Sequence, residues 1–241
     1  MLAASNAIVL HCLPYSDSNH IVHLYTEEFG RMSYMVRLGK GKQAGLKRAL
    51  FQPLSILTIQ ADLKGSRQLQ RIKDATTLYP FGSIPFDVTK SSIALFLAEV
   101  LYRSLRDTER NPVLFEFLTR SIQWLDLGER GLANFHLVFL IKLTRYLGCY
   151  PNLEGQREGW LFDLQGGVFV PNCPPHNAWL NPTDAQAFAR LMQITYDNMW
   201  AYGFEHGQRV HILRQMLDYY RLHLTDFPGI KSLDVLEDLF R

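Results

Sequence analysis

Glycines and cations are concentrated in one stretch of the chain, VRLGKGKQAGLKRALFQPL, which runs from Val36 to Leu54. The stretch contains no acid, and its glycines and cations are Gly39, Gly41, Gly45, Arg37, Lys40, Lys42, Lys47 and Arg48. Such a segment commonly binds phosphate, because glycine lets the backbone approach closely and the cations neutralise the charge. Two sources of phosphate have to be distinguished: a nucleotide in an active site, and the backbone of a nucleic acid.

The nucleotide interpretation fails on spacing. In a P-loop the second glycine stands five residues after the first, and Lys and then Ser or Thr follow it to reach the phosphates and the magnesium ion. Five residues after Gly39 the chain has Ala44, and Arg48 stands where the hydroxyl is required. Gly39 and Gly41 also lack the third glycine of a dinucleotide-binding fingerprint. A nucleic-acid backbone is therefore the favoured source of phosphate.

Other residues that could do chemistry form no convincing catalytic set. His20 and His23 are three residues apart, which suits a metal-binding pair on a helix. Their segment is instead typical of a strand, so we expect surface or half-buried histidines that bind no metal. Cys149, Cys173 and His176 are a conceivable metal site without an evident fourth ligand, and no C-x-x-C surrounds either cysteine. No nucleophile-elbow pattern occurs. We expect no enzymatic activity, no metal and no cofactor.

The distribution of charge along the chain is more informative about a binding partner than the net charge of +2. Between Arg31 and Lys73 there are ten Lys and Arg residues and one acid, Asp62, whereas the rest of the chain carries fifteen basic and twenty-two acidic residues. A basic block of this kind predicts a polyanionic partner, although a solvated lysine-rich loop is the alternative. The predicted nucleic-acid-binding residues are Arg31, Arg37, Lys40, Lys42, Lys47, Arg48, Arg67 and Arg71.

Aromatic side chains lie within or beside the same block, at Tyr25, Phe29, Tyr34 and Phe51. Proteins that bind single strands combine a basic groove with flat side chains on which bases stack. A small barrel also needs large side chains to fill its core, so we expect half of these aromatics to be buried. Tyr34 shares the apolar face of its segment with Met32 and Val36 and is expected inside.

The first eighty residues read as short strands that are joined by turns. Arg31–Leu38 alternates between apolar and polar positions, as a half-buried strand does. Five such segments in fewer than eighty residues indicate a small barrel. The expected strands are Ala7–Leu13, Ile21–Thr26, Arg31–Leu38, Leu54–Ala61 and Leu69–Ile72, and the basic stretch is expected to be a loop between the third and the fourth.

Helical periodicity begins after Pro80–Pro85 and continues to Gly148, which is a plausible C-terminal stop. Leu132–Leu147 is apolar on most sides and is expected to be the buried central helix. Trp160–Val170 reads as a hairpin around Gln165-Gly166-Gly167. A capping box at Thr183–Gln186 is expected to open a helix toward Trp200. Two further helices follow, one carrying Val210 to Leu224 and one beginning at Ser232.

The remaining features bound the class of protein. A chain of 241 residues with 47% hydrophobic residues suits one large domain or two small ones. No run of eighteen apolar residues suggests a membrane span, and the N-terminal sequence lacks the basic region and cleavage site of a signal peptide. Cys12, Cys149 and Cys173 cannot all pair, so a reducing, cytoplasmic setting is expected.

Several segments together resemble the RecO family of bacterial recombination mediators. The N-terminal matches are the Tyr15 to Asp17 turn, Thr26 to Gly30 at a strand end, the basic Gly39 to Arg48 loop, and Phe51-Gln52-Pro53. Further matches are Asn111-Pro112-x-Leu114-Phe115, Leu147-Gly148-x-x-Pro151-x-Leu153 and Lys231-Ser232-Leu233. Each motif is weak alone, but their order and spacing cover nearly the whole chain.

The resemblance implies an α+β protein with a five-stranded OB-fold barrel at residues 1–80 and a mainly helical domain at 81–241. It implies a bacterial, nucleoid-associated protein that binds single- and double-stranded DNA, anneals complementary strands and assists RecA loading. Expected partners are RecR and the acidic C-terminal tail of single-strand-binding protein. Many members carry a four-cysteine zinc module after the central helix. Here residues 149–180 hold two cysteines, so a zinc-free hairpin is expected.

The predicted mechanism involves no covalent chemistry by the protein. A basic barrel neutralises the repulsion between two strands and keeps their bases accessible, so that they can pair. The alternative is a protein-interaction adaptor whose basic block binds an acidic partner tail in place of DNA.

Overall fold

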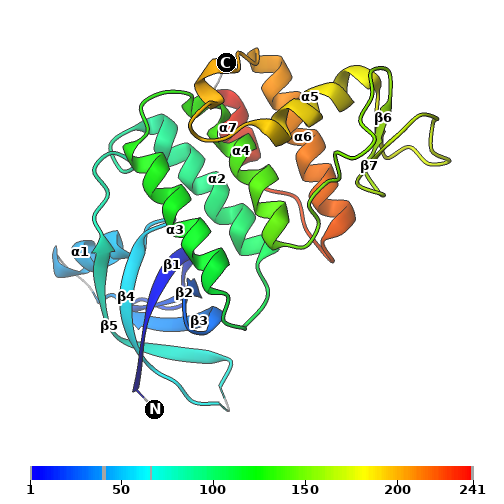
Figure 1. The fold of residues 1–241 in the computed structure, drawn as a ribbon. Coiled ribbons are helices and arrows are strands. Elements are labelled where there is room, and N and C mark those ends of the chain that lie inside the picture. The colour runs from blue at the N-terminus through cyan, green and yellow to red at the C-terminus, as the bar shows by residue number, and fades with distance from the viewer. Residues whose placement is uncertain (1, 40–41, 66, 240–241) are drawn as a thin grey trace. The chain divides into compact units, whose positions relative to one another are not determined.

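The computed structural model describes residues 2–39, 42–65 and 67–239 (Figure 1). The chain forms two compact units, one of Met1–Leu127 with Ile230–Leu236 and the other of Gly128–Gly229 with Glu237–Arg241. This grouping places the helices at 88–104 and 112–127 in the same unit as the N-terminal strands. The domain boundary that we predicted after residue 80 stays a prediction. Of the helices described, none has the length and apolarity needed to cross a membrane.

Five strands of the first unit close into a barrel in the order β1-β2-β3-β5-β4. Every neighbouring pair is antiparallel except β3 and β5, which are parallel. A five-stranded barrel of this topology is an OB-fold, so the predicted fold class is confirmed. The strands are β1 (Leu2–Pro14), β2 (Asn19–Thr26), β3 (Gly30–Arg37), β4 (Ile56–Asp62) and β5 (Leu69–Tyr79).

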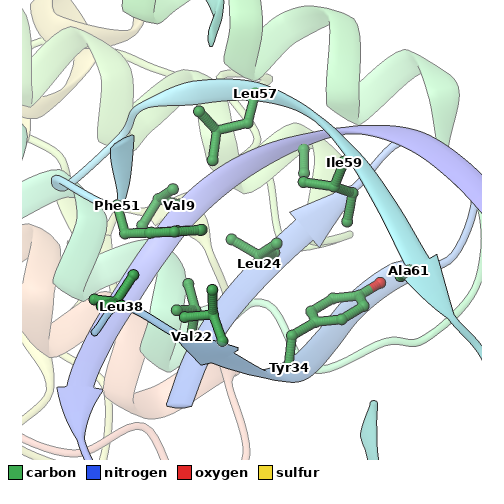
Figure 2. Packing of buried hydrophobic residues seen from close by; sticks show 11 residues of the cluster. Val9, Val22, Leu24, Tyr34, Leu38, Phe51, Leu57, Ile59 and Ala61 are labelled. Carbon is green, nitrogen blue, oxygen red and sulfur yellow. The ribbon is translucent and has the colours of Figure 1, made fainter. Parts of the chain in front are cut away.

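The barrel encloses an apolar core that its strands supply by alternation (Figure 2). On β3 the side chains of Tyr34 and Val36 point inward, and Met32 packs against the same cluster. Tyr34 is fully buried, as predicted, and its aromatic ring occupies the interior beside Ala61 (Figure 2). Burying a large side chain stabilises a fold by about 1.5–3 kcal/mol, so the core fixes which face of each strand is left for ligands.

The expected loop between β3 and β4 is wrong from Lys42 onward. Lys42–Leu50 forms helix α1. Gln, Ala, Leu, Lys and Arg are all good helix formers, and they outweigh the single glycine at position 45. The glycine and charge content of this stretch had suggested a loop, but a short helix with basic residues in its last turn satisfies the backbone better.

Two helices of the first unit follow the barrel, α2 (Val88–Ser104) and α3 (Pro112–Leu127). Asp126 on α3 is buried and accepts hydrogen bonds from the backbone N–H groups of Gly82, Ser83 and Ile84 at 2.8–2.9 Å. The buried Lys90 ammonium donates to the Asp126 carbonyl oxygen at 2.7 Å. This network fixes the connection that leads from β5 into α2.

The second unit is built around α4 (Leu132–Tyr146), most of whose side chains are buried, as predicted. It packs against α5 (Pro182–Gln193), α6 (His206–His223) and the short helix η1 (Met199–Ala201). Gly148 follows α4 with a φ of 75°, and the Cys149 N–H donates to the Thr144 carbonyl at 3.0 Å. That pair is the Schellman ending that glycine favours, so the predicted stop is confirmed.

The predicted hairpin is confirmed as β6 (Leu161–Asp163) and β7 (Val168–Val170), which form a small sheet with β8 (Trp179–Leu180). The predicted capping box is wrong, because the helix begins two residues earlier. Asn181 is the N-cap of α5, and its side chain accepts from the Asp184 N–H at 3.0 Å. Pro182 then takes the first helical position, where its missing N–H costs nothing. A last helix, α7, spans Leu233–Leu239.

We expect Asp126→Asn to lower the free energy of unfolding at pH 7 by about 2 kcal/mol or more, because an NH₂ donor replaces one of the two oxygens that accept from buried N–H groups. Burial alone raises the pKa of Asp126, but the hydrogen bonds favour the carboxylate and hold that pKa below its ordinary value. A group with a lowered folded-state pKa stabilises above its unfolded pKa, and the contribution disappears as the pH falls through the folded pKa. Urea unfolding at pH 7 and pH 3.5 measures the effect.

Glu116→Gln is the matched control, because Glu116 lies on the same helix and is exposed. Its effect should stay within about 0.5 kcal/mol. Equal losses in both variants would contradict a special role for Asp126.

Candidate nucleic-acid interface

A groove opens where β3 and β5 separate. The parallel pairing of these strands covers only Ser33–Met35 of β3 and Leu69–Arg71 of β5. Beyond it, α1 packs against β5, and a hollow of about 370 Å³ remains between the three elements. We call this hollow the basic groove; it is lined by Val36, Arg37, Leu38, Gly39, Lys47, Leu50, Phe51, Ile72, Lys73, Asp74 and Ala75.

Three cations from three elements meet at the basic groove. Arg37 is the last residue of β3, Lys47 lies on α1 and Lys73 on β5, and all three side chains are exposed. Within the described part of the chain, none of them forms an ion pair. Exposed and uncompensated cations around a concave surface attract a polyanion, because low-dielectric walls focus the field.

Lys73 was not among the predicted site residues. The sequence carried a signal for it, because Lys73 stands two residues after Arg71 and strand side chains repeat with period two. The predicted strand ended at Ile72, so the alternation was not followed further. The structure extends β5 to Tyr79.

The other predicted cations are placed differently. Arg71 on β5 and Arg67 in the connection before it are exposed but are not among the residues that line the basic groove. The predicted residue Lys40 lies outside the described residues, and for Lys42 only the backbone, at the start of α1, is described. The structure therefore brings Arg37 and Lys47 together from the predicted set and leaves Arg67 and Arg71 beside them on the barrel.

Arg48 lines a second, larger hollow of about 700 Å³ in the same unit. We call it the apolar groove; its floor includes Leu38, Phe51, Pro53, Leu95 and Val235. Besides Arg48, the cations Arg103 and Lys231 stand at its edge. Glu99, the one acid among its described lining residues, accepts hydrogen bonds from the backbone N–H groups of Lys231 and Ser232 at 3.0 and 2.9 Å.

Arg31 has a structural role. Its guanidinium donates to the Leu105 carbonyl at 2.8 Å and lies 4.6 Å from the centre of the Tyr102 ring. Burial lowers the pKa of Arg31, although an arginine stays charged at neutral pH. Because these contacts occupy the guanidinium, we leave Arg31 out of the surface proposed below.

The pKa values of His11, His20 and His23 in this unit are lowered, so these histidines add little positive charge at neutral pH. His11 and His23 each lie 4.9 Å from the Tyr102 ring centre. Burial, then the charges of Arg31 and His11, lowers the pKa of His23 to about 4. Burial and the charge of Arg48 lower the pKa of His20. The positive field on this unit therefore comes from Lys and Arg.

Most of the aromatic candidates are part of the core. Tyr25 and Phe51 are 3% and 5% exposed and Tyr34 is fully buried, so none of the three offers a free face to a base. Phe29 is partly exposed at the turn between β2 and β3. The basic groove therefore offers an apolar floor of aliphatic side chains in place of an aromatic platform.

The conceivable metal site at residues 149–180 does not assemble. Cys149 and Cys173 are free thiols, and His176 approaches Asp163 with 3.4 Å between Nε2 and Oδ1. Burial raises the pKa of Cys149 to about 11, which disfavours the thiolate that binds metal. Among the described residues, no three His, Cys, Asp or Glu side chains are grouped to hold a metal ion.

These features define a class: proteins in which an N-terminal OB-fold barrel with exposed cations precedes a helical region. Comparison with known proteins narrows it to one family. The family described as "Recombination protein O N terminal" matches residues 1–81, and "Recombination protein O C terminal" matches residues 85–234. The chain therefore belongs to the RecO family.

Full-length relatives agree with this assignment. The chain is 47% identical to the DNA repair protein RecO of Phocaeicola vulgatus and 45% identical to that of Bacteroides fragilis, with 100% of both chains covered in each case. The DNA repair protein RecO of Flavobacterium psychrophilum is 34% identical over the same extent.

We expect Arg31→Lys to lower the free energy of unfolding by about 1–2 kcal/mol, because lysine keeps the charge but loses the fixed donor geometry and the stacking over Tyr102. Arg37→Lys, at an exposed position of the same strand, is the control and should change stability by less than about 0.5 kcal/mol. Thermal and urea unfolding of both variants measures the difference in stability. Equal stability of the two would contradict the structural role of Arg31.

Proposed function

We propose that this protein acts in recombinational DNA repair by binding the DNA backbone through the basic groove. The observation that carries the proposal is the meeting of Arg37, Lys47 and Lys73 from three elements at one concave surface. Family membership supports the process, since the similar full-length relatives are DNA repair proteins by name. Arg67 and Arg71 extend the positive surface over the barrel beside the groove.

The groove suits a single strand. A hollow of about 370 Å³ accommodates one flexible chain, in which successive phosphates meet the cations and the bases lie against the aliphatic floor. Double-stranded DNA binds the same exposed cations from outside, through its backbone alone. Because these contacts do not read sequence, the surface accepts many different strands.

Annealing follows from charge neutralisation, and no bond is made or broken. Two strands repel each other through their phosphates, and cations at the protein surface reduce this repulsion while the strands are brought together. Bases of the bound strand that lie outside the groove stay accessible to a complementary strand. In this role the protein lowers the barrier to pairing without an active site.

The proposed partners follow from membership of the RecO family. RecR is proposed to act with this protein in loading RecA onto strands covered by single-strand-binding protein. The acidic tail of single-strand-binding protein is the proposed recruiting partner. Such a tail and DNA are both polyanions, so the two would compete wherever they use the same cations.

The triple variant Arg37→Glu/Lys47→Glu/Lys73→Glu tests the DNA surface. If the protein neutralises roughly five phosphates of a single strand, the logarithm of the binding constant falls with the logarithm of the salt concentration with a slope of about −3.5. Losing three contacts should bring that slope to about −1.4 and weaken binding at low salt at least tenfold. Fluorescence anisotropy of a labelled single-stranded oligonucleotide at several salt concentrations measures both quantities.

Arg130→Glu/Arg157→Glu/Arg190→Glu is the matched control, since it changes the net charge equally at three exposed positions outside the barrel unit. Circular dichroism and thermal unfolding establish that each variant is folded. Equal weakening by both triple variants would mean that overall charge, and not the groove, attracts DNA. Unchanged binding by the groove variant would contradict the proposal.

The alternative function, a protein-interaction adaptor, is favoured by one observation: the apolar groove. Its apolar floor and the cations Arg48, Arg103 and Lys231 that line it suit an acidic segment that also carries apolar side chains. Tyr102 is not a free stacking platform there, because arginine and histidine side chains surround its ring. This argues for a peptide over a base.

Direct competition separates the two functions. A labelled acidic peptide that ends in apolar residues is bound to the protein and then challenged with single-stranded DNA. We expect Arg103→Glu/Lys231→Glu to weaken peptide binding and to leave DNA binding intact if two surfaces exist. Loss of both ligands in that variant would indicate one shared surface.

A further inference from the structure

One carboxylate stands in the basic groove. Asp74 is exposed and lines the groove beside Lys73, and its carboxylate forms no hydrogen bond or ion pair within the described part of the chain. A carboxylate near a phosphate-binding surface opposes binding through like-charge repulsion. A surface that served only to attract phosphate would do better with a neutral residue at this position.

A β-bulge directs Asp74 into the groove. Gln60 of β4 pairs with Asp74, and Ala61 pairs with Ile72, so Lys73 is an extra residue between two successive pairs. In an unbroken strand alternate side chains point to opposite faces, whereas here the four consecutive residues from Ile72 to Ala75 all line the groove. Bulges of this kind redirect side chains at functional sites.

The bulge therefore places a cation and a carboxylate side by side over an apolar floor. Lys73 can contact a phosphate, while the partly exposed side chains of Leu50, Ile72 and Ala75 can pack against the face of a base. With the base held there, Asp74 lies near its edge. An ionised carboxylate only accepts hydrogen bonds, so its partner has to be a donor on the base.

We propose that Asp74 accepts a hydrogen bond from the exocyclic amino group of a base held in the basic groove, and that it makes the protein prefer cytosine over thymine in single strands. Cytosine presents its N4 amino group as a donor, whereas thymine presents the O4 carbonyl, which a carboxylate repels. Adenine carries an N6 amino group and should resemble cytosine. This inference rests on the proposed DNA-binding function of the same groove.

The expected preference is modest. The contact is solvent-exposed and involves a single carboxylate, so it should reach only the low end of base discrimination, about fivefold in affinity for oligo-dC over oligo-dT. A preference of this size still leaves the protein able to bind and anneal strands of any sequence.

The test compares the binding of ten-nucleotide oligo-dC and oligo-dT, by fluorescence anisotropy at neutral pH, to the wild type, Asp74→Ala and Asp74→Asn. We expect Asp74→Ala to weaken oligo-dC binding and to tighten oligo-dT binding by about twofold as the repulsion is removed, which abolishes the preference. Asp74→Asn should also lose the preference, because its amide can donate to the thymine carbonyl as well as accept from cytosine. Glu109→Ala, an exposed carboxylate of the same unit that does not line the groove, should change neither affinity.

The outcomes distinguish this inference from the function on which it rests. Salt-sensitive binding of both oligonucleotides with equal affinity, a preference that survives in Asp74→Ala, or equal tightening of both oligonucleotides would each overturn the role of Asp74 and leave the DNA-binding proposal standing. Absence of binding to either oligonucleotide, or full binding by the triple groove variant, would overturn the DNA-binding proposal itself.

Discussion

The parallel pairing of β3 with β5 is the constraint on which the rest of the N-terminal unit depends. Three residue pairs, Ser33–Met35 with Leu69–Arg71, close a barrel whose other ladders are all antiparallel. Because the pairing is so short, the two strands part soon after it begins. The helix between β3 and β4 then fills part of the gap, and the basic groove is what remains. Closure of the barrel and formation of the candidate site are thus consequences of one short ladder.

Burial and charge are divided between the two faces of the same strands. The inward positions carry apolar side chains, including Tyr34, and leave no large aromatic free for ligands. The outward positions of β3 and β5 include Arg37 and Lys73, which form no ion pair within the described part of the chain. Repulsion among such cations lowers the stability of the folded state, and the apolar core has to offset it. We regard this opposition as the physical sign of a surface that is kept for a polyanion.

Much of the fold could be predicted from sequence, because the barrel strands bury alternate residues and the helices bury every third or fourth. β3 followed its alternation, α4 was recognised as a helix that is apolar on most sides, and the hairpin was recognised from its glycines. The OB-fold assignment came from a family resemblance, since no local pattern encodes which strands pair. Helix α1 was missed because Gly45 and a run of lysines suggested a loop, whereas the surrounding residues are good helix formers. The start of α5 was misplaced because Asn181 and Thr183 are both competent N-caps.

The candidate site was predictable in composition but not in detail. A count of Lys and Arg located the positive surface on the barrel. It could not show that Arg31 is held by Tyr102 and Leu105, residues more than seventy positions away in the chain. Lys73 and Asp74 were absent from the predicted site for another reason. The later part of β5 is polar and largely exposed, so it shows no hydrophobic alternation, and a bulge changes its register. The misplaced role of Arg31 comes from tertiary contacts that local periodicity does not contain, whereas Lys73 and Asp74 were missed because the predicted strand ended at Ile72.

Amide hydrogen exchange with and without a single-stranded oligonucleotide tests the central claim most directly, because it reports where the strand lies on the wild-type protein. The account predicts slower exchange on bound protein at Val36–Gly39, at Lys47–Phe51 and at Ile72–Ala75, the three segments that line the basic groove. Protection confined to the second unit, with these three segments unchanged, would contradict it.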